Sequence, residues 1–419
     1  MTLTLKNVTI LDSTSSFHTE VVDVMIDAGV LVKIGSELSG DKEVDLSGKL
    51  LCNSFIDMSA HMMDPGNEHR EDLRSGAAAA AASGFGQVCL LPNTSPAIDT
   101  KGNVEYLLSK SKGFTTEILP YGAISVKCEG ENMSEMHDLH EAGAVAFTDG
   151  LNSVQNSELL LKSMQYVQKF GGLVINHPGD RDLERFGQMH EGIVSTNLGM
   201  KGMPAIAESI MIERDLKLLE YVDGRLHFAR ISSKAGVELI RAAKSRGLPV
   251  SADVAIASLV FTDKEMVDFD TNYKVYPPLR SEEDRKALHE GLSDGTIDAI
   301  VSHHLPHDEE GKKLEFDLAE FGMNAFDSFY PMLLQLSREL PFDLLLEKIT
   351  HSPRKLLGLP DYHVREGEKA HLAILDQDAE WNYDRASSKS KSFNSPYFGH
   401  TLKGRCLAVI NGENVFWNK

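Results

Sequence analysis

The chain has 419 residues and a formal net charge of −20. Nucleic acid and anionic membranes would repel so acidic a surface, so neither is an expected partner. No apolar run approaches the ~20 residues of a membrane span, and no basic segment followed by an apolar core opens the sequence. The four cysteines include no C-x-x-C pair. We therefore expect a cytoplasmic protein with reduced thiols that handles small molecules or other proteins.

The two ends of the chain are expected to form one small β-sandwich. Short apolar runs alternate with turn residues over 3–50, which is typical of antiparallel strands. A matching pattern returns in 370–375 and 406–410, where an Asn-Gly pair then favours a hairpin turn. Neither end has enough apolar surface to fold alone, so residues 1–50 and 362–419 should pair as one domain.

Residues 51–361 alternate between strand-like and helix-like segments, which predicts a (β/α)8 barrel closed on itself. The eight strand candidates are 51–58, 87–91, 117–123, 144–147, 173–176, 226–230, 249–254 and 299–302. The helix candidates include 70–83, 157–170, 204–219, 234–246 and 282–292. Functional side chains of such a barrel stand at the C-terminal ends of its strands. The residues just after each run are therefore the candidates for a site.

The first of these strand ends carries Asp57, Ser59, His61 and Met63, followed by an Asp-Pro-Gly turn. Taken alone, a single histidine at a strand end is more often structural than a metal ligand. The stretch resembles the metal-binding strand of the dihydroorotases, which are cyclic amidohydrolases with the pattern Phe-Ile-Asp-x-His-x-His-x-Arg-Asp/Glu-Pro-Gly. Ser59 stands at the first histidine of that pattern, and Met63 stands at its substrate-binding arginine.

Further strand ends resemble the same family. Asn93, in Leu-Pro-Asn-Thr-Ser-Pro, matches an asparagine that helps to hold the substrate carboxylate. Asp149 matches an aspartate that bridges the metals in one branch of the family, and His177 matches a metal-binding histidine. Gly179 replaces the glutamate that is usual two residues later. The resemblance thus implies three retained metal-binding positions, namely His61, Asp149 and His177.

Three other strand ends depart from the family. Arg230 replaces a metal-binding histidine, Tyr276 replaces a substrate-contacting asparagine, and His303 replaces the aspartate that serves as general base. Arginine is permanently charged and has no lone pair to donate. Two unit charges ~4 Å apart repel by about 4 kcal/mol at an effective dielectric constant of ~20, so Arg230 and a metal ion are close to mutually exclusive. Arg230 is expected instead to pair with Asp149, which would otherwise lack a counter-charge.

The resemblance as a whole implies a dihydroorotase-like protein of pyrimidine biosynthesis with a degraded metal site, holding no metal or weakly bound zinc. Whether it is still an enzyme is left open. Such a protein is expected to be a non-catalytic partner or scaffold, with the catalytic chain of aspartate transcarbamoylase as the expected partner. We also expect a homo-oligomer.

Two alternatives stay open. In the first, the chain is a working dihydroorotase or other cyclic amidohydrolase, in which a histidine takes the place of the general-base aspartate. Its mononuclear metal site would be rebuilt from His61, Asp149, His177 and His303. In the second, the chain is a small-molecule sensor that uses the old pocket through Asn93 and Arg230.

Overall fold

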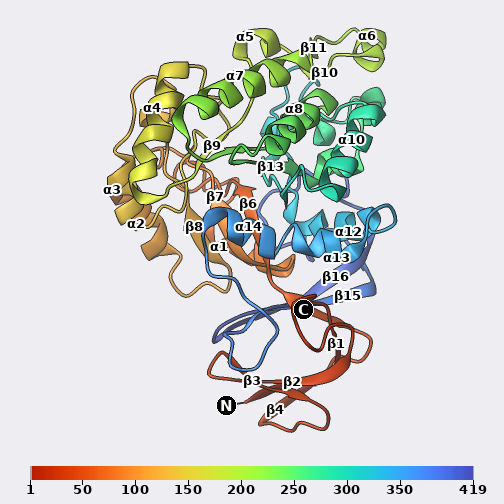
Figure 1. Ribbon diagram of the computed structural model, residues 1–419. Coiled ribbons are helices and arrows are strands. Elements are labelled where there is room, and N and C mark those ends of the chain that lie inside the picture. Colours follow the sequence, from red (N-terminus) through yellow and green to blue (C-terminus); the bar gives the residue numbers. More distant parts are fainter. Residues whose placement is uncertain (1, 419) are drawn as a thin grey trace.

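The computed structural model describes residues 2–418, and its larger part is a barrel of parallel strands surrounded by helices (Figure 1). Around the barrel, the strands are β6 (Phe55–Ala60), β7 (Phe85–Leu90), β8 (Glu117–Pro120), β9 (Val174–Asn176), β12 (Leu226–Phe228), β13 (Val250–Ala255) and β14 (Ala299–Val301). The fourth position is reduced to Phe147, which bridges Gly122 and Val174. A bridge between Ala60 and His304 closes the ring. The predicted (β/α)8 barrel is confirmed.

Helices lie outside the strands and connect them. They are α1 (Leu73–Ala82), α2 (Lys101–Lys110), α3 (Met136–Glu141), α4 (Ser157–Val167), α7 (Ile206–Val222), α8 (Lys234–Ser245), α10 (Glu282–Ser293), α12 (Phe326–Leu336), α13 (Phe342–Glu347) and α14 (His351–Leu357). Helix α1 starts at Leu73, later than the start predicted at residue 70. The Asp72 carboxylate accepts a hydrogen bond from the Ser75 amide and caps the helix there.

Shorter elements fill the connections. They are η1 (Val126–Cys128), η2 (Gln168–Phe170), α5 (Arg181–Glu184), β10 (Met189–His190), α6 (Ile193–Leu198), β11 (Gly202–Met203), α9 (Ile256–Val260), η3 (Asp263–Asp268), η4 (Thr271–Tyr273) and α11 (Glu309–Lys312). Among these, η1 and α5 matter most below, because they contribute to the walls of a cavity at the C-terminal end of the barrel.

Both ends of the chain meet in a second, smaller part below the barrel (Figure 1). Its strands are β1 (Leu3–Ile10), β2 (Val21–Asp27), β3 (Val30–Gly35), β4 (Lys42–Asp45), β5 (Leu50–Asn53), β15 (His371–Asn382), β16 (Thr401–Asn411) and β17 (Asn414–Trp417). They form one connected sheet in the order β17-β16-β15-β5-β1-β2-β3, with β4 paired to β1. Leu5, Val24, Leu51 and Leu372 belong to its own buried core. The sheet extends past the domain boundary expected at residue 50, because β5 pairs with β1 and β15 and the first barrel strand is β6.

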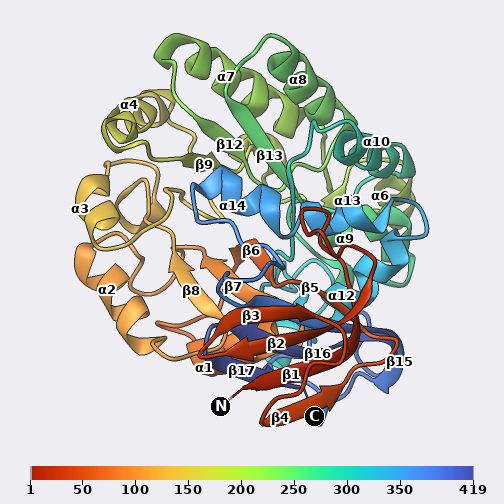
Figure 2. The same ribbon diagram turned by 60° about the horizontal axis from the view of Figure 1, so that its bottom comes forward.

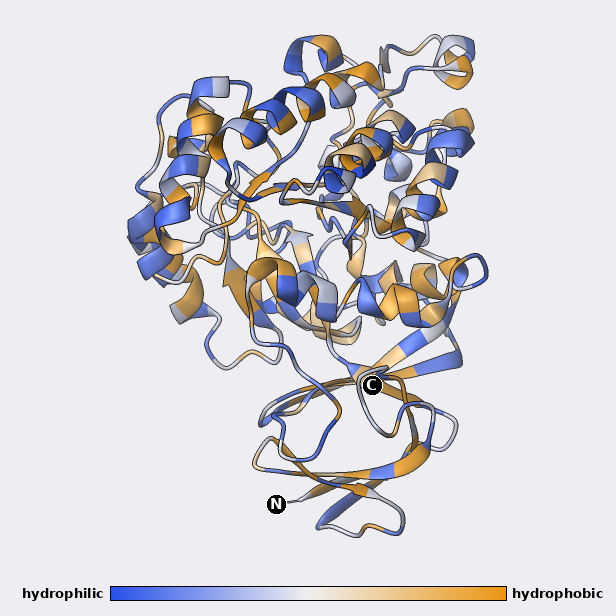
Figure 3. Cartoon of the chain, in the orientation of Figure 1, coloured by the Kyte–Doolittle hydropathy of each residue, from blue (hydrophilic) through white to orange (hydrophobic). Residues whose placement is uncertain are grey.

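The core of the barrel lies inside the ring of strands. Ile56, Cys89 and Tyr121 form a buried cluster there, together with Leu357 of α14. Figure 2 shows α14 across the centre of the ring of helices, and the Ile56 amide donates to the Ile349 carbonyl just before this helix. Figure 3 shows hydrophobic residues along the strands and hydrophilic ones on the outer faces of the helices. Because α14 lies across this end, the N-terminal end of the barrel is closed. No helix of the described chain has the length and apolar character needed to cross a membrane.

Residues 383–400 form a strap between β15 and β16. The sequence predicts an exposed, polar loop over 378–392, and the structure agrees with this for 384–386 but not for the two ends of the segment. β15 continues to Asn382, and Ser390, Ser392 and Asn394 of the strap are buried. The Ser392 hydroxyl donates to the Arg70 carbonyl (2.7 Å), and the Asn394 amide donates to the Leu305 carbonyl (3.1 Å). Polar side chains can be buried here because barrel groups satisfy them.

Candidate functional site

His61, at the end of β6, is buried and has both ring nitrogens engaged. Its Nδ1 accepts a hydrogen bond from the Met63 amide (3.0 Å), and its Nε2 lies 2.9 Å from the Asn93 carbonyl oxygen. The proton must therefore sit on Nε2, which leaves no lone pair for a metal ion. Burial lowers the pKa of His61 to about 4, so the ring is neutral at neutral pH.

Asp149 follows Phe147, in the fourth strand position, and its carboxylate points to a neighbouring loop. One oxygen accepts from the Ser125 amide (2.9 Å) and the other from the Ser125 hydroxyl (2.5 Å). Burial raises the pKa of this carboxyl to about 6. Among the described residues, Arg230 is not one of its ion-pair partners. The predicted pair between Arg230 and Asp149 is wrong, because two Ser125 donors already neutralise part of the charge on the carboxylate.

Arg230 extends its side chain into the interior of the barrel mouth and is completely buried. Its guanidinium donates from Nη1 to Ser59 Oγ (3.3 Å) and from Nη2 to the Gly150 carbonyl (2.8 Å), while Nε has no partner. Its backbone amide donates to Asp253 Oδ1 (2.6 Å), and its φ of +56° is in the left-handed region. A permanent cation thus lies between the ends of strands that would have to converge on a metal ion.

His177 and His303 lie in the same buried region. His177 Nδ1 donates to the Ala229 carbonyl (3.2 Å), and its Nε2 has no partner. His303 Nε2 lies 2.8 Å from the Tyr276 carbonyl, and its Nδ1 lies 3.4 Å from Ser59 Oγ. Burial, and then the charge of Arg230, lowers the pKa of His177 to about 3 and that of His303 well below its usual range. Both rings are neutral.

The residues present do not fit a metal ion at the barrel mouth. A divalent metal needs several converging lone pairs. Among the described residues, His61, Asp149 and His177 do not form a group whose donor atoms all approach within 4.8 Å of one another. Of these three, only His177 has an unengaged nitrogen, and the Arg230 guanidinium is beside it. The side chains that would have to supply the lone pairs therefore do not fit a metal ion.

The expected substrate-binding residues serve mainly structural contacts. The Asn93 side chain donates to the Asp149 carbonyl (2.9 Å) and accepts from the Leu151 amide (2.8 Å), so it holds the loop after the fourth strand position. Met63 is buried, with a φ of +57°. The contacts of Asn93 and Arg230 with backbone groups give no support to a sensor that uses these two side chains.

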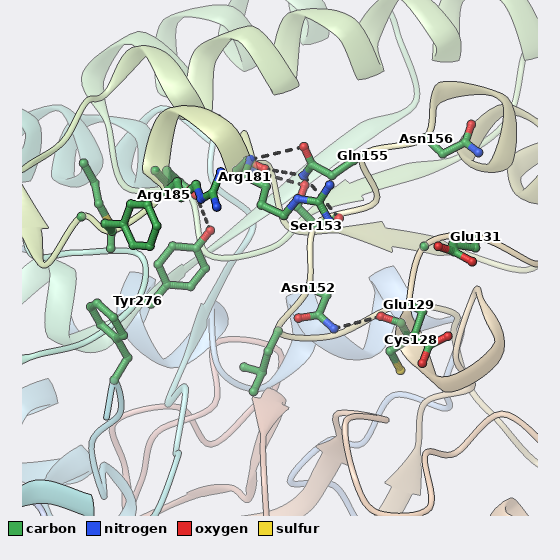
Figure 4. A pocket seen from close by; sticks show the side chains of 18 of the residues that line it. Cys128, Glu129, Glu131, Asn152, Ser153, Gln155, Asn156, Arg181, Arg185 and Tyr276 are labelled. Atoms are coloured by element: carbon green, nitrogen blue, oxygen red, sulfur yellow. Dashed lines mark hydrogen bonds between the residues drawn. The ribbon is translucent and has the colours of Figure 1, made fainter. Parts of the chain in front are cut away.

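A cavity of about 1030 Å³ lies at the C-terminal end of the barrel (Figure 4). Polar and charged side chains from three loops line most of it, including those of Lys127, Glu129, Asn152, Gln155, Arg181, Glu184 and Arg185. Of the residues that the sequence analysis singles out, Gly179 and Tyr276 line it. The predicted metal and base positions lie outside its lining, so the cavity does not reach the groups that chemistry at the old site would need.

Glu184 is the lining residue that sequence reasoning missed. The Tyr276 hydroxyl donates to Glu184 Oε2 (2.5 Å), and burial raises the pKa of this carboxyl to about 7. The Tyr276 ring also packs edge-on against His177, with centroids 4.8 Å apart. A Cβ at Gly179 would lie 2.5 Å from Tyr276 Oη and 2.7 Å from Glu184 Oε2. The glycine at position 179 and the tyrosine at position 276 therefore belong together, because the glycine leaves room for the contact between Tyr276 and Glu184. This pair of changes is the sequence signal that could have identified the contact.

Comparison with known proteins finds relatives that are named dihydroorotases. A family model described as dihydro-orotase-like matches residues 48–236. The chain is 37% identical to a dihydroorotase of Trichlorobacter lovleyi, over 99% of both chains. It is 39% identical to a dihydroorotase of Pelotomaculum thermopropionicum, over 99% of this chain and 98% of that one.

Solved structures agree on the fold. An L-hydantoinase (dihydropyrimidinase) from Arthrobacter aurescens matches with a TM-score of 0.86 and 22% identity, over 100% of this chain and 96% of that one. A D-hydantoinase matches with a TM-score of 0.83 and 19% identity, over 99% and 95% of the two chains. At these identities the likeness concerns the barrel and its β-rich companion, and a shared fold does not imply shared chemistry.

Proposed function

Because this chain belongs to the dihydroorotase family and yet places a buried arginine in the mouth of its barrel, we propose that it serves pyrimidine biosynthesis as a non-catalytic protein. The observation that carries the proposal is the position of Arg230. The family resemblance puts a metal-binding histidine at this position, whereas here the Arg230 guanidinium contacts Ser59 and Gly150. The barrel is kept, while the positions that would perform the chemistry are used for internal packing.

The chemistry of the family explains why these changes matter. Hydrolysis of a cyclic amide at neutral pH needs a strong nucleophile, which a bound metal provides by lowering the pKa of water from about 15.7 to about 7. The donor set here does not fit that ion. His303 is also a poor substitute for the general base, since Nε2 is bonded to the Tyr276 carbonyl and Nδ1 faces Ser59. Met63 cannot make the bidentate carboxylate contact of an arginine.

The remaining role is association with another protein. We propose the catalytic chain of aspartate transcarbamoylase as the partner, on the basis of the family resemblance. The net charge of −20 supports a protein partner over nucleic acid, because a polyanion would be repelled. A folded barrel without a usable centre can still contribute a surface to an assembly.

An activity assay with added Zn²⁺ or Mn²⁺ tests the proposal. The purified chain should not interconvert carbamoyl aspartate and dihydroorotate, while the Trichlorobacter lovleyi relative, measured in parallel, is the positive control. Turnover of about 1 per second, at the low end for ordinary enzymes, would overturn the proposal if it is abolished in His177→Ala. Activity that survives in His177→Ala would be assigned to a contaminant and would leave the expected result intact.

The second candidate is an active dihydroorotase with a rebuilt metal site. The 37–39% identity to proteins named dihydroorotase over nearly the whole chain favours it, as does the free Nε2 of His177. It requires Arg230 to leave the mouth when substrate or metal enters. The two candidates therefore differ in one measurable way: the second predicts metal-dependent turnover that needs His61, Asp149, His177 and His303.

A further inference from the structure

A group of histidines and carboxylates lies at the end of the barrel opposite the mouth, where the barrel meets the small sheet. Asp12 follows β1, His351 begins α14, and His363 lies between α14 and β15. Among residues 2–418, these three are the one group of at least three histidine, cysteine or acidic side chains whose donor atoms all lie within 4.8 Å of one another. None of the functions considered above uses them.

The tautomer of His351 is set by its neighbours. Its Nδ1 lies 2.8 Å from Asp361 Oδ1, so Nδ1 carries the proton and donates it to this carboxylate. The Asn53 side-chain nitrogen lies 3.4 Å from Nε2. In this tautomer Nε2 has a lone pair, which accepts the hydrogen bond from Asn53. A histidine that donates one nitrogen to a carboxylate and presents the other as a lone pair has the arrangement common among metal ligands.

The Nε2 lone pair of His351 faces Asp12. Nε2 and Asp12 Oδ1 are 3.6 Å apart, which is too long for a hydrogen bond between them. A positive charge between these two groups stabilises them, and either a proton on Nε2 or a bound metal ion supplies it. Zinc-to-ligand distances of 2.0–2.1 Å in a tetrahedral site place neighbouring donor atoms about 3.3 Å apart, so the observed separation is close to what one shared ion requires.

Asp12 is held in position for this role. It is completely buried, its Oδ1 accepts from the amide and the hydroxyl of Thr14 (2.9 and 2.6 Å), and its Oδ2 accepts from the Val364 amide (2.7 Å). The buried Asn53 side chain beside it has an Oδ1 without a partner. Its Nδ2 donates to Asp12 Oδ2 (3.2 Å), which adds to the contacts that fix the carboxylate.

We propose that Asp12, His351 and His363 bind a divalent transition-metal ion of the zinc class, which joins the small sheet to the closed end of the barrel. Two imidazoles and a carboxylate are the ligand types that zinc prefers, and three protein ligands leave a fourth position for water. His351 and His363 are only partly buried, so an ion can enter from solvent. Asp361 orients His351. The ion ties together segments that are more than three hundred residues apart in the sequence.

Titration of the full-length, chelator-treated chain with Co²⁺ tests the proposal, because bound Co²⁺ reports its ligands in its visible absorption. One equivalent should bind, Zn²⁺ should displace it, and Zn²⁺ should raise the melting temperature. The double variant His351→Gln/His363→Gln should lose the absorption. Asp361→Asn, which keeps every direct ligand, should weaken binding by about 10–100-fold. His400→Gln, at an exposed histidine, is the matched control and should leave the titration unchanged.

Variants at the mouth separate this proposal from the one on function. Co²⁺ binding that persists in His177→Gln and disappears in the double variant supports both proposals. Binding that disappears in His177→Gln and persists in the double variant overturns both. A wild-type chain that binds no Co²⁺ overturns the junction site alone. If circular dichroism shows that the double variant is unfolded, the Co²⁺ affinity of Asp361→Asn decides between the outcomes. An affinity about 10–100-fold below that of wild type supports the junction site, and an unchanged affinity overturns it.

Discussion

Arg230 combines two unfavourable features in one residue. A non-glycine residue at positive φ costs roughly 1–2 kcal/mol, and a buried guanidinium with an unpartnered Nε carries a desolvation cost. Hydrogen bonds to Ser59 and Gly150 offset part of that cost. Residues in such conformations persist where the surrounding structure determines them strongly, which is the case at the ends of barrel strands.

The strain at position 230 leads to a stability test. Arg230→Gly should be more stable than Arg230→Ala by about 1 kcal/mol, because glycine adopts the left-handed conformation freely. Urea denaturation of both variants measures the difference. The same pair of changes at Arg241, inside α8, should give the opposite order, since glycine costs about 1 kcal/mol in a helix. An alanine variant as stable as the glycine variant at position 230 would contradict the strain argument.

Glu184 gives a pH-dependent prediction. Its folded pKa of about 7 lies above the ordinary value of 4.5, so the folded chain binds an extra proton between these values. The stability that this group contributes is present below about pH 4.5 and is lost as the pH rises through about 7. Glutamine does not titrate, so the Glu184→Gln variant does not lose this stability as the pH rises. The difference in free energy of unfolding between variant and wild type should therefore change by about 1–3 kcal/mol in favour of the variant from pH 5 to pH 8. Denaturation at the two pH values measures this, and a constant difference would contradict it.

At the scale of elements, the strap over 383–400 fixes the side of the barrel to the small sheet. Asn394 is its central contact, because its Oδ1 accepts from the His307 amide (2.9 Å) and its Nδ2 donates to the Leu305 carbonyl (3.1 Å) and the Gly322 carbonyl (3.2 Å). The polar side chains of the strap therefore work as a buried network, which must be fully bonded to be tolerated.

Asn394→Ala should destabilise the chain by about 2–4 kcal/mol, since it leaves several buried backbone groups without partners. Asn382→Ala is the matched control, because Asn382 is exposed and its side chain accepts a hydrogen bond from the Thr401 hydroxyl (2.8 Å), which also lies at the surface. Thermal unfolding compares the two variants. Equal melting temperatures would mean that water replaces the lost bonds and that the strap is not a buried network.

The sequence predicts the elements better than it predicts the contacts between them. Apolar runs separated by helical segments are enough for the barrel, because burial on both faces leaves a clear pattern. The strap was missed, since serines and asparagine look the same in an exposed loop and in a bonded, buried one. Arg230 was expected in the mouth, but its partners were not: sequence reasoning looks for an opposite charge, whereas Ser125 had already bound Asp149.

For the whole molecule, association is the central prediction. The chain should co-elute in size-exclusion chromatography with the catalytic chain of aspartate transcarbamoylase from the same organism, at micromolar concentrations. The expected reason is that a folded barrel without a usable centre acts through its surface. The control is a mixture with an unrelated protein of similar charge. Separate elution of two folded chains would remove the proposed partner and leave the role of the protein to another interaction.

The pairing of β5 with both β1 and β15 also has a consequence during synthesis. Leu50–Asn53 can join β1 at once, but its other edge waits for His371–Asn382. A ribosome that adds about 5–20 residues per second needs on the order of half a minute to make the intervening chain. For that time the nascent sheet has an open edge, to which another strand could add. The newly made chain should therefore depend on chaperones until its last strands emerge.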